Sequence, residues 1–276
     1  MKPVDFAYAR PRRLADAIAL LAESGERGKV MAGGQSLGPM LNMRLVQPEL
    51  IVDITALDEL KQAGKAGDHL VLGACVTHAD IEDGRVGDVT NGAMRAVARG
   101  IAYRAVRNRG TIGGSLTNAD PSADWVSALS ALGAEAIVRG ADGARTLAVE
   151  DFVTGALETV LGANELLEAI RVPAQSAAAQ WGYYKVCRKT GEYAQAIGVV
   201  LLDRPRDVFR AVIGATERRP LVLPDARALF GGSTDLSQFD SRAADMMLQS
   251  IGMSDALDRQ IHIVALARAV RQAAGA

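Results

Sequence analysis

Two short segments with the same skeleton constrain the fold of this chain more than any other feature. The first is AGGQSL, Ala32–Leu37, and the second is IGGSL, Ile112–Leu116. In each, a glycine pair is followed by a small polar residue and then leucine. Because glycine has no Cβ, successive backbone N–H groups can turn toward one anion, and nearby hydroxyls add donors. A single segment is more typical of a tight turn, but two matching copies predict a fold that brings them together around a pyrophosphate.

The residues around the two segments favour FAD over other nucleotides. No lysine follows the glycines as in a P-loop, and no third glycine completes a Rossmann turn. The second segment continues into TNADPSADW, which contains Asn118, Asp120 and Asp124. A carboxylate here can accept hydrogen bonds from ribose or ribityl hydroxyls. Each of the three residues also fits a helix cap or a turn, especially Asp120 before Pro121.

Periodicity predicts helices and strands in alternation along the first part of the chain. RRLADAIALLAES and ADWVSALSAL have the pattern of helices, and THADIED that of a short capped helix. NGAMRAVARGIA predicts a helix that is entered through Asn91. KVMAG, PELIVDI, HLVLGACV and LLEAIRVP are typical of strands, the last ending at Pro173. AEAIVRGADGARTLAV predicts a hairpin whose turn lies at Asp142 and Gly143.

A change of composition predicts a domain boundary. Small and polar residues replace the apolar pattern in PAQSAAAQ, residues 173–180. Beyond it, WGYYKVCR, YAQAIGVVLLD and DVFRAVIGAT predict three strands, and the chain from about residue 224 predicts helices, the last over 254–274. Strands followed by helices are typical of an α+β domain. We therefore expect an α+β protein with domains at residues 1–173 and 180–276.

Composition excludes several classes of partner. The 276 residues carry a net charge of −1 and are 49% hydrophobic, which predicts a globular protein without a basic surface for nucleic acid or anionic lipid. No apolar run reaches the ~18 residues that cross a bilayer, and the N-terminus lacks a signal sequence, so we expect no membrane span and a cytoplasmic location.

The residues that usually bind metals are few and scattered. Cys75 and Cys187 are far apart and have no ligand spacing, which excludes a four-cysteine cluster site and predicts two reduced structural thiols. The histidines are His69, His78 and His262, and none belongs to either glycine segment. We expect no metal site and no catalytic residue in this chain, with His78 a capping or surface residue.

Five segments, in the same order over nearly the whole chain, resemble one family. They are F-x-Y-x-x-P near the start, AGGQSLGPMLNMRLVQPELIVDI, GACVTHADI, RNRGTIGGSLTNADPSAD and WGYYKVCRKTGEYA. The family comprises the FAD-binding (medium) subunits of molybdenum hydroxylases, as in carbon monoxide dehydrogenase, and the FAD domain of xanthine dehydrogenase. The resemblance implies a two-lobed FAD-binding domain of the vanillyl-alcohol-oxidase (PCMH) type, followed by a smaller domain of sheet and helices.

The resemblance also implies where the cofactor binds. Together with the acids and amide that follow the second segment, the expected contacts are Ala32, Gly33, Gly34, Gln35, Ser36, Leu37, Ile101, Thr111, Ile112, Gly113, Gly114, Ser115, Asn118, Asp120, Asp124, Leu167, Lys185 and Tyr193. Ile101 departs from the family, because xanthine dehydrogenases have an aromatic residue there. Lys185 is expected near the isoalloxazine, where its charge would favour reduced anionic flavin. Tyr193 fits a flavin neighbour or an ordinary strand aromatic equally well.

The resemblance implies an electron-transfer role. FAD would be bound non-covalently, since neither segment contains histidine or cysteine. Partner subunits would carry the molybdenum cofactor and two [2Fe–2S] clusters, in a dimer of heterotrimers, and FAD would pass electrons to a final acceptor. Two alternatives stay open: a self-contained FAD-dependent reductase of related fold, and a non-enzymatic nucleotide-binding module. The substrate and the acceptor are not specified by this sequence.

Overall fold

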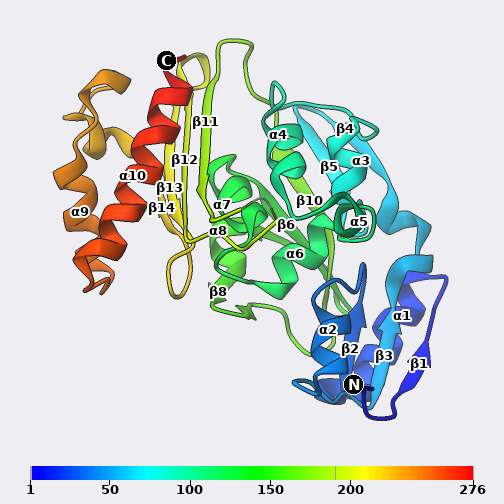
Figure 1. The fold of residues 1–276 in the computed structure, drawn as a ribbon. Helices are drawn as coiled ribbons and strands as arrows, with labels where there is room; N and C mark the ends of the chain where they lie inside the picture. Colours follow the sequence, from blue (N-terminus) through cyan, green and yellow to red (C-terminus); the bar gives the residue numbers. More distant parts are fainter. Residues whose placement is uncertain (1, 190, 276) are drawn as a thin grey trace.

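The computed structural model describes residues 2–189 and 191–275. Its N-terminal part is a small lobe built on a parallel sheet (Figure 1). Its strand order is β1-β3-β2, and both pairs are parallel. Helix α1 packs on this sheet through Ile18 and Leu21, which are buried with Val52 of β3. The elements of this N-terminal lobe are β1 Ala7–Ala9, α1 Leu14–Ser24, β2 Gly28–Met31, α2 Leu37–Asn42 and β3 Leu50–Asp53.

A larger central lobe follows, built on a five-stranded antiparallel sheet. The strand order is β4-β5-β10-β6-β7, so β10, late in the sequence, lies between earlier strands. Trp125 is fully buried in the core between this sheet and its helices. The elements of the central lobe are β4 Ala63–Ala66, β5 His69–Gly73, α3 His78–Glu82, α4 Ala93–Gly100, α5 Arg104–Arg107, α6 Ile112–Asn118, α7 Asp124–Ala131, β6 Glu135–Gly140, β7 Gly143–Ala148, α8 Val149–Phe152, β8 Val153–Gly155, β9 Glu158–Thr159 and β10 Leu166–Pro173.

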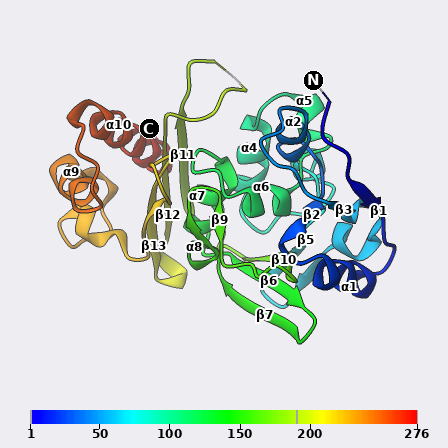
Figure 2. The ribbon, with the colours of Figure 1, turned by 90° about the horizontal axis from the view of Figure 1, so that it is seen from below.

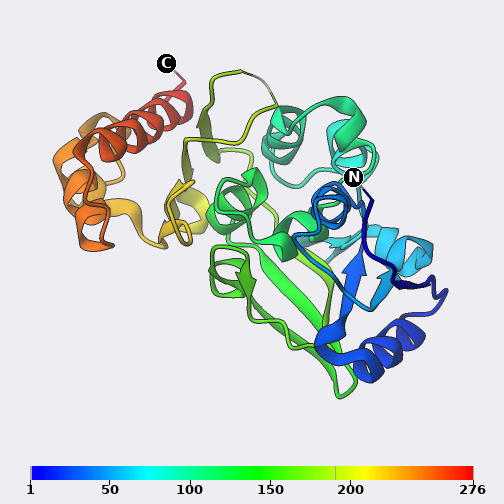
Figure 3. The ribbon, with the colours of Figure 1, turned by 60° about the horizontal axis from the view of Figure 1, so that its bottom comes forward.

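The C-terminal part is a four-stranded antiparallel sheet between helices. Helix α10 packs on one face, and α7 of the central lobe packs on the other (Figures 1 and 3). The approach of α10 is very close, because a Cβ at Gly182 would lie 1.8 Å from the carbonyl oxygen of Ala269. The elements are β11 Gln180–Val186, β12 Ala196–Asp203, β13 Val208–Gly214, β14 Leu221–Leu223, α9 Ser241–Ser250 and α10 Ala256–Ala273.

Short 3₁₀ turns connect these elements. They are η1 Gly25–Arg27, η2 Ile54–Ala56, η3 Asp58–Lys61, η4 Arg204–Arg206, η5 Ala226–Phe230 and η6 Leu236–Gln238. None of the helices in the described ranges is long and apolar enough to cross a membrane.

The α+β class and most predicted elements are confirmed, and two local predictions are wrong. The helix predicted from Asn91 begins at Ala93, because Asn91 has a left-handed φ of 52° and the hydroxyl of Thr90 accepts from the N–H of Met94. The hairpin turn lies one residue earlier than predicted, since Gly140 pairs with Gly143 across it. Helix α2 and strand β14 are short and were not predicted.

Candidate functional site

A cavity of about 580 Å³ lies between the N-terminal and central lobes, which is within the usual range for a cofactor site. The segment after β2, the start of α6, the start of α7 and the loop between β11 and β12 all line it. Figure 2 shows why these distant segments meet: α2 of the N-terminal lobe lies beside α6 of the central lobe. We call this space the interlobe cavity.

The structure brings the sequence-predicted site residues together at this cavity, with one exception. The residues that line it are Ala32, Gly33, Gly34, Gln35, Ser36, Leu37, Ile101, Thr111, Gly113, Gly114, Ser115, Asn118, Asp120, Asp124, Leu167, Lys185 and Tyr193. Ile112 does not line it, because its side chain is fully buried in the core of the central lobe and its N–H donates to the carbonyl oxygen of Val76. The prediction that Ile112 faces the cofactor is therefore wrong for its side chain.

The first glycine segment is a loop with unused backbone donors. No acceptor among the described residues bonds the N–H groups of residues 33–37. Gly34 has a φ of 69°, a conformation that residues with a Cβ rarely adopt. Gly33 is packed against the chain just before the second segment, since a Cβ there would lie 2.1 Å from the carbonyl oxygen of Arg109. Five consecutive donors without partners at a cavity wall are suited to bind an anion.

The second glycine segment has a different structure. It forms the first turn of α6, where Thr111 is the N-cap and its hydroxyl accepts from the N–H of Gly114 at 3.0 Å. The N–H of Gly113 donates to the carbonyl oxygen of Ala74, and that of Ser115 to Thr111. The expectation that both glycine pairs offer converging amides is therefore wrong for the second pair, because protein acceptors already use those N–H groups.

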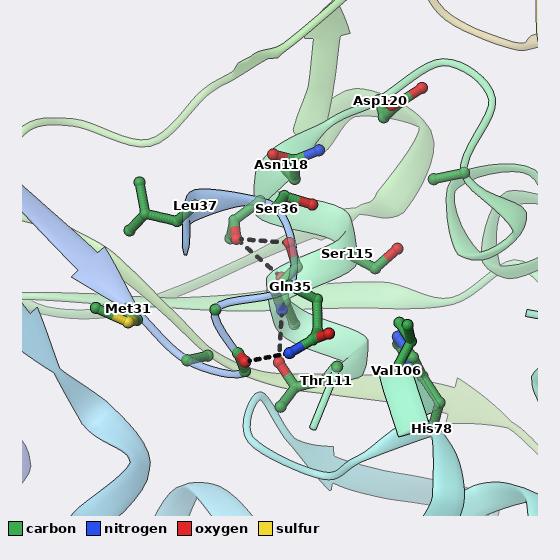
Figure 4. A pocket seen from close by; sticks show the side chains of 18 of the residues that line it. Met31, Gln35, Ser36, Leu37, His78, Val106, Thr111, Ser115, Asn118 and Asp120 are labelled. Carbon is green, nitrogen blue, oxygen red and sulfur yellow. Dashed lines mark hydrogen bonds between the residues drawn. The ribbon is translucent and has the colours of Figure 1, made fainter. Parts of the chain in front are cut away.

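What the second segment offers to the cavity is space and side chains. A Cβ at Gly114 would lie 2.8 Å from the capping hydroxyl of Thr111 and 3.8 Å from the Cβ of Ala32 in the first segment. Figure 4 shows Gln35 and Ser36 of the first loop next to the first turns of α6, with Ser115 and Asn118 on that helix. The Ser115 hydroxyl and the Asn118 amide thus line the same cavity as the unused amides of the first loop.

A buried ion pair stands at another wall of the cavity. Asp124, the first residue of α7, accepts through Oδ1 from Lys185 Nζ at 2.7 Å and from the Tyr183 hydroxyl at 2.6 Å. Lys185 also donates to the carbonyl oxygen of Gly100. Burial, followed by the nearby charge of Asp124 and the hydrogen bond to it, raises the pKa of Tyr183 well above its usual value. Asp124 offsets part of the charge of Lys185, and the expected effect of Lys185 on the flavin stays a prediction.

A second cation orders the turn that carries Ile101. Arg107 Nη1 donates to the carbonyl oxygens of Ile101 and Ala102, at 2.9 and 3.0 Å. Arg107 is itself buried and paired with Glu82. Ala102 has a φ of 41°, so these hydrogen bonds hold the turn in an unfavourable conformation that directs Ile101 to the cavity.

Two other predicted residues lie where the chain turns. Tyr193 lies in the loop between β11 and β12 and is 67% exposed, so the interpretation as a strand aromatic is wrong. Asp120 accepts from the N–H of Ser122 and so forms a local turn, as its position before Pro121 also predicted. Both nevertheless line the interlobe cavity.

Sequence reasoning missed His78. It was expected at the surface or as a cap, but it is 5% exposed and lines the cavity. Trp125 Nε1 donates to His78 Nδ1 at 3.0 Å. Burial, assisted by the charge of Arg107, lowers the pKa of His78 to about 4. The capping prediction fails because Thr77 and Asp80 form the capping box of α3, and no local signal in the sequence points to Trp125 as a partner.

These features fit FAD. A cavity of this volume with a loop of unused amides suits a pyrophosphate, and the polar groups of α6 and Asp124 suit hydroxyls. Apolar wall residues such as Ile101 and Leu167 suit a flavin ring. Within the described ranges, no cluster of three or more histidine, cysteine or acidic residues is arranged to hold a metal ion.

Comparisons with known proteins agree with this geometry. A family model described as the FAD binding domain in molybdopterin dehydrogenase matches residues 4–175. The caffeine dehydrogenase subunit beta of Pseudomonas sp. (strain CBB1) is 36% identical over 225 residues, covering 80% of this chain and 76% of that protein. The carbon monoxide dehydrogenase medium chain of Hydrogenophaga pseudoflava is 35% identical over 224 residues, covering 81% and 78%.

The solved structures give the same result over the full length. The carbon monoxide dehydrogenase from Hydrogenophaga pseudoflava that lacks the Mo-pyranopterin moiety of its cofactor contains a chain that matches with a TM-score of 0.88 at 29% identity. The match covers 100% of this chain and 99% of that one. The C-terminal sheet and helices therefore belong to the shared architecture as much as the two lobes do.

Proposed function

We propose, from the premise that this chain belongs to the family of FAD-binding domains in molybdopterin dehydrogenases, that it binds FAD in the interlobe cavity and transfers electrons within a molybdenum hydroxylase complex. The observation that carries the proposal is the first glycine loop, whose N–H groups at residues 33–37 have no acceptor among the described residues. Donors that line a cavity without a protein acceptor are available to a ligand, and a pyrophosphate supplies acceptors in a row.

Different walls of the cavity are assigned to different parts of the cofactor. The first loop and the hydroxyl of Ser36 would hold the pyrophosphate, with Gly114 leaving room beside it. Asp124 would accept from a cofactor hydroxyl through the carboxylate oxygen that Lys185 and Tyr183 do not use. The proposed contacts to FAD are the predicted residues that line the interlobe cavity. FAD would be bound non-covalently.

The electron path follows from what FAD supplies when bound, since it exchanges electrons singly or in pairs and can connect one-electron and two-electron carriers. In this proposal an iron–sulfur subunit delivers electrons from a molybdenum subunit that oxidises the substrate, and a terminal acceptor removes them. Support comes from the relatives, which are named as a medium chain and a subunit beta of dehydrogenases. This chain would position FAD and exclude water, and it would oxidise no organic substrate itself.

We also propose a division into an FAD-binding domain, residues 1–173, and a C-terminal domain, residues 180–276. The strands of the two parts belong to separate sheets. Helix α7 packs against β12 and β13, and the Asp124–Lys185 pair crosses the same contact, so we expect the two parts to unfold together. A dimer of heterotrimers is the proposed assembly.

Expression of the chain alone and together with candidate partner subunits tests the proposal. The isolated protein should copurify with FAD at one per chain, seen in its absorption spectrum, and a chemical reductant should bleach it. No organic substrate should bleach it until an iron–sulfur subunit and a molybdenum subunit are added. Absence of flavin would contradict the binding proposal, whereas multiple turnovers by the isolated chain would indicate a self-contained reductase.

A further inference from the structure

We infer that His78 is a further cofactor-binding residue, whose Nε2–H donates a hydrogen bond to an acceptor oxygen or nitrogen of the bound FAD. The inference rests on the proposed FAD site. It concerns a residue that lies outside both glycine segments and outside the ion pair at Asp124.

The tautomer of His78 is determined by its buried neighbour. The indole of Trp125 can only donate, and its Nε1 lies 3.0 Å from His78 Nδ1. His78 Nδ1 must therefore be the acceptor, and in the neutral ring the proton is on Nε2. The ring stays neutral near pH 7, because burial and the charge of Arg107 lower the pKa of His78 to about 4.

The position of the ring is held from several sides. The backbone N–H of His78 donates to the carbonyl oxygen of Gly110 at 2.9 Å, and the capping box of Thr77 begins the helix at this residue. The ring centroid lies 6.2 Å from that of Trp125 in a tilted arrangement. A donor whose ring is fixed in this way is preorganised for one acceptor position.

The donor itself has no partner in the protein. No described residue accepts a hydrogen bond from His78 Nε2, although the side chain is 5% exposed. The ring lines the interlobe cavity beside Val106 (Figure 4). Nε2 is accessible from the cavity, so a ligand that fills the cavity covers this donor and has to supply an acceptor for it.

Gly110 keeps the ring accessible from the cavity. A Cβ at this position would lie 2.9 Å from both Nε2 and Cδ2 of His78. Gly110 lines the cavity next to Thr111, so any side chain here would cover the donor. The ring edge of His78 that carries Nε2 is therefore accessible because residue 110 is a glycine.

A double variant removes the Nε2–H donor without leaving a new buried polar group, whereas its control, Trp125→Phe, leaves His78 Nδ1 without its donor. The Trp125→Phe variant keeps His78 and serves as the matched control. The double variant His78→Phe/Trp125→Phe replaces both partners by apolar rings, which is far less disruptive than removing one of them. We expect FAD to bind the control within about threefold of the wild type and the double variant about tenfold more weakly, as measured by fluorescence titration.

The His78→Gln variant tests rescue. The amide of glutamine can place a donor near the position of Nε2, so its FAD affinity should lie between those of the control and the double variant. Titration with FMN, riboflavin and ADP identifies the part of the cofactor that is contacted, because the fragment that lacks the acceptor should bind both variants equally. Equal FAD affinity of the double variant and the control would overturn the inference.

Nitrogen NMR of ring-labelled histidine gives a readout that is independent of affinity. With His78→Gln used to assign the signal, the free protein should show the proton on Nε2, and FAD should shift the Nε2 resonance. A proton on Nδ1 would overturn the inference even if FAD binds. If the wild type binds no flavin, the proposed function fails, whereas flavin binding that is insensitive to His78 contradicts this inference alone.

Discussion

The two glycine segments have almost the same letters and two different structures. AGGQSL is a loop in which Gly34 is left-handed and the amides of residues 33–37 have no described acceptor. IGGSL is the first turn of α6, where Thr111, Ala74 and Val76 accept from the amides. The first segment can bind an anion with its backbone, whereas the second contributes space and hydroxyls. A shared motif therefore does not imply a shared backbone role.

The first glycine of each pair is nevertheless equivalent. A Cβ at Gly33 would lie 2.1 Å from the carbonyl oxygen of Arg109, and one at Gly113 would lie 2.5 Å from the Cβ of Ala74. All four glycines line the cavity, but at the first glycine of each pair the added Cβ would meet backbone atoms of a neighbouring segment, which is not so at the second. The comparison thus separates glycines that hold the fold from glycines that admit the ligand, and the following experiments test that separation.

The largest effect is expected at the first glycines. Gly33→Ala and Gly113→Ala should each lower the free energy of unfolding by about 3 kcal/mol or more, because rigid backbone atoms occupy the space of the added methyl group. Denaturant titration measures it. Gly38→Ala is the control, since nothing lies within 4 Å of a Cβ there and alanine favours the helix. A wild-type midpoint for either core variant would contradict the packing argument.

Acid should destabilise the folded protein by protonating His78, which lies beside the second segment. The folded pKa of His78, about 4, lies below its ordinary value of 6.5, so the unfolded chain binds the proton first. The contribution of neutral His78 to the free energy of unfolding is fully present above pH 6.5. It falls as the pH approaches 4, by roughly 3 kcal/mol in total. Stability measured between pH 7 and 4.5 should fall less steeply in His78→Gln. Identical slopes for the two proteins would show that His78 is not buried in its neutral form.

The second glycines should affect the ligand more than the fold. Gly114→Val places its side chain against the Thr111 hydroxyl and beside Ala32, and should weaken FAD by about 100-fold or more while the apoprotein folds with the α6 cap displaced, at a cost of about 1 kcal/mol. Gly34→Val should also lose flavin, with a further cost of about 1–2 kcal/mol in stability from the left-handed φ. The flavin-to-protein ratio and thermal denaturation separate the two quantities. Full flavin occupancy in both variants would remove the glycine pairs from the FAD site.

The smallest effect on stability is expected at the hydroxyls beside the glycine pairs, those of Thr111 and Ser36. Thr111→Val removes the cap of α6 and should cost about 1 kcal/mol in the free protein, whereas Thr111→Ser retains it. Ser36→Ala should change stability by less than about 0.5 kcal/mol, because the Ser36 side chain caps nothing. Thermal denaturation without FAD measures both. Equal losses at the two positions would mean that the segments have the same structure after all.

Local patterns in the sequence were sufficient for much of this protein. The apolar period of residues 14–24 predicted α1, and the short apolar runs around residues 196–203 and 208–214 predicted β12 and β13. The family was identified from ordered motifs, and nearly all of the residues to which those motifs pointed line the interlobe cavity. These features depend on neighbours in the chain or on short fixed spacings, which a sequence displays directly.

Only the tertiary structure decided which backbone donors are free and which charges are paired. The amides of Gly113 and Gly114 look as available in the sequence as those of Gly33 and Gly34. The structure shows that Ala74, which follows β5, and Thr111 accept from them. The Lys185–Asp124 pair joins positions 61 residues apart, and Trp125 and His78 are separated by 47. A hydrogen bond between such distant residues leaves no periodic trace, because its partners meet only after the lobes and the C-terminal sheet have packed.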